Sequence, residues 1–163
     1  MPHTQKNNMA KPVPASKLTA NDTSAKGRLA QIRIYENAEY RYYRVKDLAV
    51  AGTQVVEYSS TTDAVTKDRS GGSSIGRTVA GVAAATVSAG NYGWMQISGS
   101  VSVLTPAGVA LAAGDLVVPH ATSDGGVNKA TTATFRHAFA VALSADTATT
   151  AGAGITKVAL IRV

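Results

Sequence analysis

Residues 79–99 read VAGVAAATVSAGNYGWMQISG, and this stretch decides the fold class of the chain. It begins with small and apolar residues, passes through Ala89-Gly90-Asn91, and continues as Tyr92–Ile97, where side chains alternate between two faces as they do in a strand. Glycine adopts positive φ at little steric cost, so Gly90 is a suitable point for the chain to reverse. We therefore predict a hairpin with strands on both sides of Gly90.

The same Ala-Gly dipeptide precedes three further β-rich segments, with its glycine at Gly52, Gly114 and Gly152. Gly52 and Gly90 are 38 residues apart, and so are Gly114 and Gly152. Equal spacing of this kind predicts an internal pseudo-repeat, with one half at about residues 40–99 and the other at about residues 100–163.

Short segments of β-branched and aromatic residues run through the chain, separated by Gly, Pro, Ser and Thr. No window combines a 3.6-residue apolar period with helix caps. We therefore expect an all-β fold, a small β-barrel or tulip-like sandwich of short antiparallel strands with an extended N-terminal arm. The expected strands cover about residues 29–34, 39–46, 53–58, 80–85, 92–98, 100–104, 116–119, 135–143 and 155–163. A long surface connection is expected at residues 59–76, and a turn at Asp124–Gly126.

The first 28 residues differ in composition from the remainder of the chain. They contain few large apolar residues and supply +4 of the formal net charge of +6. Such a segment does not recover its ordering entropy alone, so we predict two parts: residues 1–28 as a flexible or docking arm, and residues 29–163 as a single β-rich domain. The arm lacks the apolar core of a secretory signal, and no apolar run approaches the roughly 20 residues of a membrane-spanning helix. We expect neither an export signal nor a membrane partner.

The sequence contains no recognisable catalytic or metal-binding constellation. It has no cysteine, which excludes disulfides and thiolate chemistry, and its three histidines, His3, His120 and His137, have no partners at metal-ligand spacing. No GxSxG motif occurs, and the glycine cluster at Gly71–Gly76 lacks the GK[ST] ending of a P-loop. We expect no catalytic, metal-binding or cofactor-binding residues and no cofactor, and therefore a non-enzymatic protein.

The sharpest binding candidate is Tyr40–Arg44, with the sequence YRYYR. Basic residues interleaved with aromatic ones on a sheet can stack bases and neutralise phosphates. The alternative is that one face of this strand is core and the other is a charged surface or subunit interface, where Tyr and Arg are also enriched. We favour the alternative, which makes Tyr40, Tyr42 and Arg44 interface candidates. Trp94 is a candidate anchor of the central hairpin, and for it plain core packing is the favoured interpretation.

Four further segments bear on the family of this protein. They are the strand around YRYYRV at residues 40–45, the segment GVAAATVSAGNYGWMQISG, the ALAAGDLVV turn, and the terminal HAFAVALSADTATTAGAGITKVALIRV. Together they resemble the capsid decoration, or cement, proteins of tailed bacteriophages. The resemblance covers roughly residues 40–163 and leaves the first 28 residues outside.

This resemblance implies a compact β-barrel or tulip-like domain that binds the outside of the expanded phage head and resists internal DNA pressure. It implies the major capsid protein as partner, a symmetric homo-oligomer, for which we favour a trimer, and a place on the outer capsid surface of the virion after synthesis in the host cytoplasm. On physical grounds we choose five arm residues for capsid docking, because proline-rich chain loses less entropy when it binds: Pro12, Val13, Pro14, Lys17 and Leu18.

Two alternatives stay open from the sequence. The first is a tail, baseplate or head-fibre structural component of a virion. The second is a nucleic-acid-binding β-barrel that uses the YRYYR strand and the basic arm, although we do not expect a nucleic-acid partner because a charge of +4 is diluted over nearly thirty residues.

Overall fold

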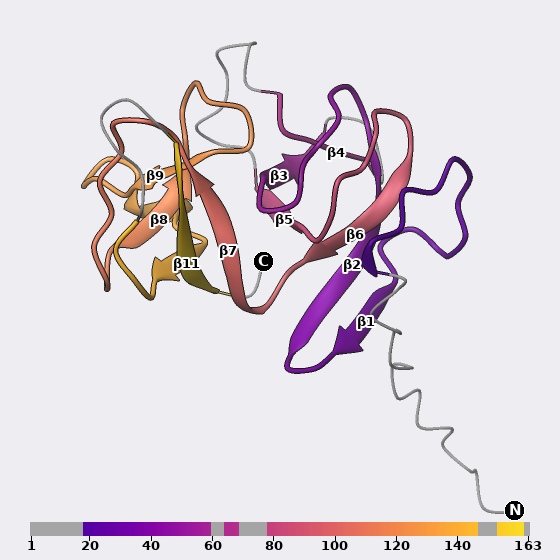
Figure 1. Ribbon diagram of the computed structural model, residues 1–163, viewed down its shortest axis with the longest axis horizontal. Helices are drawn as coiled ribbons and strands as arrows, with labels where there is room; N and C mark the ends of the chain where they lie inside the picture. The colour runs from indigo at the N-terminus through magenta and orange to yellow at the C-terminus, as the bar shows by residue number, and fades with distance from the viewer. Residues whose placement is uncertain (1–17, 60–63, 69–77, 147–152, 162–163) are drawn as a thin grey trace, which may run out of the picture.

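The computed structural model describes residues 18–59, 64–68, 78–146 and 153–161, which form short strands and one 3₁₀ turn, η1 (Phe135–His137) (Figure 1). This confirms the predicted all-β fold class. In chain order the strands are β1 (Ile32–Tyr35), β2 (Ala38–Val45), β3 (Val55–Tyr58), β4 (Ala64–Thr66), β5 (Val79–Ala83), β6 (Tyr92–Gln96), β7 (Gly99–Thr105), β8 (Leu116–Pro119), β9 (Val127–Lys129), β10 (Ala140–Ala142) and β11 (Gly154–Leu160).

Strands β2 to β6 close into a ring, which we call the first barrel. Its strand order is β2-β6-β5-β3-β4, and β4 pairs back onto β2. Every pairing is antiparallel, as predicted, except the parallel one between β2 and β4. Strand β1 adds to the outer part of β2 as a hairpin. Side chains such as Tyr43, Val56, Val65 and Met95 fill the interior.

Strands β7 to β11 form the second sheet, with the order β7-β11-β10-β8-β9. This order repeats that of the first barrel when β7 stands for β2, β8 for β3, β9 for β4, β10 for β5 and β11 for β6. The first residues of matching strands are 61 to 63 positions apart in the chain, from Ala38 and Gly99 in the first pair to Tyr92 and Gly154 in the last. The ring is not closed in the same way: β9 contacts β7, but the described residues of the two strands form no ladder.

The first barrel and the second sheet share an apolar core, and they lie side by side in Figure 1. Val55, Val79 and Val82, on β3 and β5, belong to the cluster that contains the inner residues of β7, β8, β10 and β11. Because β5 has the first barrel on one face and the second sheet on the other, all five of its residues are buried. A continuous small and apolar run in the sequence is what a strand buried on both faces requires.

The predicted hairpin at residues 79–99 is confirmed. Strands β5 and β6 pair antiparallel, with Val82 opposite Gln96, and Gly90 has a φ of 81° in the connection between them. That connection covers residues 84–91 and is longer than a tight turn, because Val87 within it makes a bridge with Val50.

Two local expectations are wrong, and one strand, β9 (Val127–Lys129), was not expected. The strand expected at residues 135–143 is reduced to β10, because Phe135–His137 forms η1 after a turn in which the Phe135 N–H donates to the Thr131 carbonyl at 2.9 Å. His137 therefore does not lie in a strand. The connection expected at residues 59–76 contains β4, and β9 follows the confirmed turn at Asp124–Gly126.

Candidate functional site

Strand β2 has one face in the first barrel and one face outside it. Tyr43 and Val45 point inward, whereas Tyr40, Tyr42 and Arg44 lie on the outer face. Cross-strand neighbours share a face of the sheet, and the register places Trp94 of β6 opposite Tyr42. The two rings are tilted, with centroids 5.0 Å apart. The outer face of β2 and β6 is therefore an aromatic surface.

Residues 18–31, which we call the cover segment, lie across this aromatic surface. Leu18, Ala20 and Leu29 pack against it. At one end, Asp22 exchanges two backbone hydrogen bonds with Tyr92 of β6, at 3.0 and 2.8 Å. At the other, the Ala30 N–H donates to the Tyr42 carbonyl at 2.8 Å.

Side chains of the cover segment strengthen this attachment. Asn21 Oδ1 accepts hydrogen bonds from the Ser88 N–H at 3.0 Å and from Asn91 Nδ2 at 2.9 Å. Asn21 Nδ2 donates to Ser88 Oγ at 3.1 Å. One asparagine thus joins the cover segment to the connection between β5 and β6.

The Tyr42 hydroxyl is the polar contact beneath the cover segment. It donates to Asp22 Oδ2 at 2.6 Å and accepts from the Lys26 N–H at 3.3 Å. Burial, and next the hydrogen bond to the Asp22 carboxylate, raise the pKa of Tyr42 to about 12. The tyrosine therefore stays protonated at neutral pH and serves as a hydrogen-bond donor.

A second polar cluster lies on the inner face of the first barrel. The hydroxyls of Tyr43 and Tyr58 are 2.8 Å apart, and Arg41 Nη1 donates to the Tyr58 hydroxyl at 3.1 Å. Burial, and next the hydrogen bond with Tyr58, raise the pKa of Tyr43 to about 12. Burial alone would lower the pKa of Arg41, but its hydrogen bonds with the two tyrosines outweigh burial and raise it. This cluster holds β2 against β3, with Tyr43 buried and Arg41 and Tyr58 half-buried.

The structure separates the interface candidates of the YRYYR strand. Tyr40 is 9% exposed and Tyr42 1%, so both are packing residues, whereas Arg44 is exposed and donates from Nε to the Gly90 carbonyl at 3.2 Å. Trp94 is buried in the same cluster, as favoured from the sequence. The cover segment occupies the outer aromatic faces of Tyr40 and Tyr42 that base stacking on this strand would need.

Of the five arm residues predicted to dock on the capsid, the structure describes only Leu18. Leu18 is buried on the aromatic surface, where the chain's own sheet occupies its apolar side chain, and its capsid-docking role stays a prediction. Pro12, Val13, Pro14 and Lys17 lie outside the described residues.

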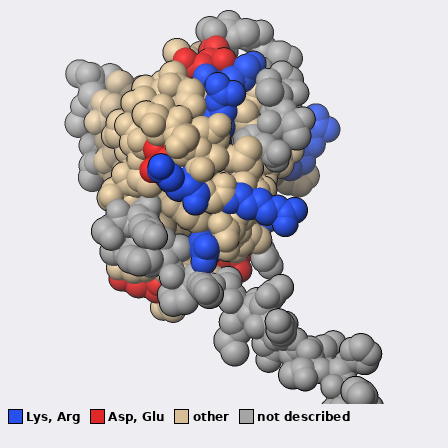
Figure 2. All heavy atoms as spheres, turned by 90° about the vertical axis from the view of Figure 1, so that its right-hand side faces the viewer, with Lys and Arg blue, Asp and Glu red and all other residues tan. Residues whose placement is uncertain are grey.

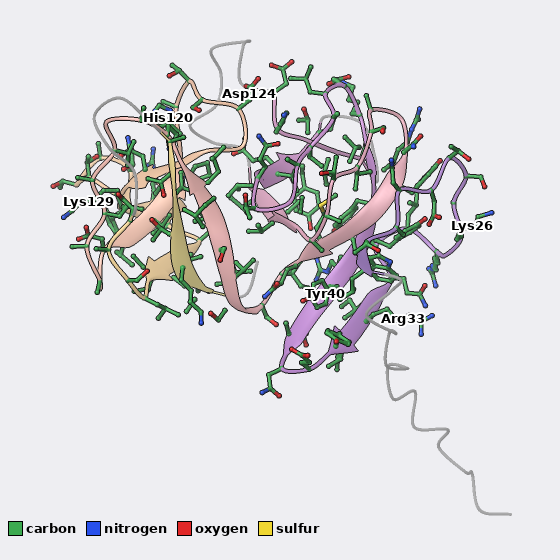
Figure 3. The ribbon with its side chains drawn as sticks, in the orientation of Figure 1. Lys26, Arg33, Tyr40, His120, Asp124 and Lys129 are labelled. Carbon is green, nitrogen blue, oxygen red and sulfur yellow. The ribbon has the colours of Figure 1, made fainter. Side chains whose placement is uncertain are left out.

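The side of the molecule formed by the cover segment and the β1–β2 hairpin is moderately basic: residues 18–45 contain five Lys and Arg residues against Asp22, Glu36 and Glu39, a formal net charge of +2. Lys26 and Arg28 are exposed on the cover segment, Arg33 is partly exposed on β1, and Arg44 is exposed on β2. Figure 2 shows this side, where Lys and Arg side chains stand out in blue, and Figure 3 shows Lys26 and Arg33 on the outer side of β2. The sequence prediction missed Lys26 and Arg28 as surface candidates because it treated their segment as separate from the body.

Within residues 18–59, 64–68, 78–146 and 153–161, no group of three or more His, Asp or Glu side chains is placed to hold a metal ion. No helix in the same ranges is long and apolar enough to cross a membrane.

No protein-family model matches the chain, and no curated protein matches it. Among solved structures it is similar to the "head fiber gp8.5 N base in bacteriophage phi29". The sequence identity is 16%, the TM-score is 0.49, and the alignment covers 74% of this chain and 92% of that one.

Proposed function

We propose that this protein is a non-enzymatic structural component of a tailed-bacteriophage virion that binds the outside of the head and stabilises the expanded shell. The proposed partner is the major capsid protein, and the proposed location is the outer capsid surface. The resemblance of residues 40–163 to capsid decoration proteins supports this proposal, as does the arrangement of the N-terminal region.

One structural observation carries the proposal. The cover segment is fixed to the outer face of the first barrel, so residues 1–17 join the body on its basic side, next to Leu18. These residues contain Lys6, Lys11 and Lys17 and no acidic residue. The described chain thus begins, at Leu18, on the side that carries exposed Lys26 and Arg28, and positive charge there suits a partner surface rich in Asp and Glu.

Shell stabilisation then follows from mass action. A protein that binds only the expanded shell stabilises it by RT ln(1 + [L]/Kd), about 4 kcal/mol per site at a thousandfold excess over Kd. Because a shell offers many equivalent sites, a moderate affinity at each one is sufficient.

The test compares binding of the purified protein to undecorated expanded heads and to unexpanded heads, with the number of bound copies counted. The truncation should remove residues 1–17 only, because a longer deletion also strips the cover segment from Tyr42 and Trp94. Charge reversal at Arg28 and Arg33 tests the basic side, and Arg136→Glu, an exposed arginine on η1, is the matched control.

We expect saturable binding to expanded heads alone, weakened by the truncation and by charge reversal on the basic side but unchanged by Arg136→Glu. Higher salt should weaken binding, since exposed charges are screened over about 8–10 Å. Absence of binding to both shells would contradict decoration and would favour a tail, baseplate or head-fibre role. Salt-sensitive binding of an oligonucleotide by the full chain would instead favour the nucleic-acid alternative.

A further inference from the structure

Strand β1 has an outer edge that differs from the other strand edges of the described chain. Strands β2 to β6 close into a ring, and β1 lies outside that ring as a hairpin partner of β2. On the second sheet the edge strands are β7 and β9, and backbone groups of both are capped. The Leu104 N–H of β7 donates to the Thr53 carbonyl at 3.0 Å. The Lys129 N–H of β9 donates to Asn128 Oδ1 at 2.8 Å. Within the described residues no group caps the outer edge of β1 in this way, and an uncapped edge can pair with another strand.

The strand register fixes which backbone groups of β1 point outward. The Tyr42 N–H donates to the Gln31 carbonyl at 3.3 Å, so this pair is bonded across the hairpin. Residues of an antiparallel ladder alternate between hydrogen-bonded and non-hydrogen-bonded pairs. Arg33 is therefore bonded to β2, whereas the N–H and C=O groups of Ile32 and Ile34 face away from it. These outward groups lie in one line, because the register of β1 with β2 is unbroken and β1 contains no proline.

The two faces of β1 differ in chemistry. Ile32 and Ile34 share one face, and the Ile34 side chain is 42% exposed. Arg33 lies on the opposite face and is partly exposed. Lys26 and Arg28 of the cover segment are exposed on that same outer side, where Figure 3 shows Lys26 and Arg33. A strand added to β1 would thus place every second side chain beside isoleucine and the alternate side chains beside positive charge.

We propose that the outer edge of β1 binds an extended segment of another protein by strand addition, and that this segment alternates apolar with acidic residues. Backbone hydrogen bonds to Ile32 and Ile34 hold the segment, and side chains on its two faces select it. Its apolar residues pack on the two isoleucines, and its carboxylates face Arg33. The β1 strand of a second copy fits this edge poorly. Antiparallel pairing through Ile32 and Ile34 would set Arg33 of one copy opposite Arg33 of the other, and like charges in that position are destabilising.

The experiment titrates the full-length protein, labelled with ¹⁵N, with a peptide that has blocked ends and the sequence Asp-Val-Glu-Val-Asp-Val-Glu-Val. Amide signals are followed by NMR, and a control peptide carries Lys at every acidic position. Ile34→Pro removes an outward N–H that β2 does not use, and proline is tolerated at such an edge position. Ile34→Val is the matched control, because it keeps the N–H with a side chain of similar size. Arg33→Glu reverses the charge beside the edge. Circular dichroism and Trp94 fluorescence check that each variant is folded.

We expect the acidic peptide to shift the amide signals of residues 31–35 selectively, with a dissociation constant of about 1 mM or below. Ile34→Pro should raise this constant by about tenfold, as loss of a hydrogen bond does, and Ile34→Val by less than about twofold. Arg33→Glu should transfer the preference to the lysine peptide.

The proposal is overturned if about 5 mM acidic peptide, well above that dissociation constant, shifts no amide signal of β1. It is also overturned if the shifts map to the second sheet, if folded Ile34→Pro binds as tightly as wild type, or if wild type binds both peptides equally. Because no heads are present, these outcomes are independent of shell binding.

Discussion

Replacing Tyr42 by phenylalanine tests whether the cover segment is held by the hydroxyl beneath it. The change removes one oxygen atom from a side chain that is 1% exposed and keeps the ring that packs against Trp94. Asp22 then loses a hydrogen bond of 2.6 Å, and the Lys26 N–H loses a longer one of 3.3 Å. Nothing else in the aromatic cluster needs to move.

The size of the effect follows from these two bonds. A hydrogen bond to a charged group contributes about 1.5–3 kcal/mol and a neutral one about 0.5–1.5 kcal/mol. The longer bond belongs at the bottom of its range, and Asp22 is partly exposed, so water replaces part of the lost interaction. We expect Tyr42→Phe to lower the free energy of unfolding by about 1.5–2 kcal/mol, or Tm by about 3–8 °C for a chain of this length.

Urea denaturation followed by tryptophan fluorescence measures this directly, because Trp94 is the single tryptophan of the chain and lies in the affected cluster. Tyr92→Phe is the matched control: Tyr92 packs in the same cluster, 6.1 Å from Tyr42 between ring centroids. The control should change stability by less than about 0.5 kcal/mol, as surface hydroxyl changes usually do. If both variants lost the same stability, the hydroxyl would have no special role and the cover segment would be held by packing alone.

Three further predictions concern stability. Gly93→Ala places a methyl group against Val87 and 3.2 Å from the Ala20 carbonyl oxygen, so it should lower the free energy of unfolding by about 1–3 kcal/mol. Gly52→Ala is the control: its methyl group meets no atom nearer than 3.6 Å, and the same urea titration should show almost no change in stability. The raised pKa values of Tyr42 and Tyr43 mean that their contribution to stability is complete below about pH 10 and is lost as pH rises through the folded value of about 12. Absorbance titration at about 295 nm should show late ionisation of Tyr42 and Tyr43, beside smaller delays for Tyr35 and Tyr40, and Tyr43→Phe should reduce the loss of stability above pH 10. The buried hydroxyls of Thr105 and Thr156 are 2.8 Å apart, so either single change to Val should cost about 1–2 kcal/mol and the double change less than their sum, which thermal unfolding of the three variants will test.

The sequence predicted those strands whose own residues carry a clear two-residue period or form a short apolar run between turn residues. Strand β8 has the predicted bounds, and β7 differs from prediction by a residue at each end, because Ser100–Leu104 alternates polar and apolar side chains. Strands β4 and β9 were not predicted, because each has three residues, too few to show an alternation of polar and apolar side chains. Their strand conformation depends on partners that are distant in the chain, β2 and β3 for β4, and β8 for β9.

The candidate site was harder to predict than the fold. The alternation of YRYYR identifies two faces of β2 but not what lies on each, because the cover segment that buries Tyr40 and Tyr42 is about twenty residues away. Residues 1–28 contain few apolar residues, so their sequence did not indicate that the second part of this segment packs on the body. Asn21 and Asp22 attach that part through hydrogen bonds rather than through buried apolar surface. A polar segment can therefore be ordered by a partner surface within the same chain.

The two sheets show how one strand order can present two different outer surfaces. On the first barrel the outward residues of β2 and β6 are aromatic, and their large area is buried by fourteen residues of the preceding chain, 18–31. On the second sheet the matching strands present Ser102, Leu104 and Ile155, which are smaller and stay accessible. Aromatic residues left uncovered would form an apolar patch that favours aggregation, and the cover segment removes that patch from solvent. The cover segment thus gives the first barrel a polar outer surface with exposed Lys26 and Arg28, whereas the matching strands of the second sheet keep their aliphatic side chains partly exposed.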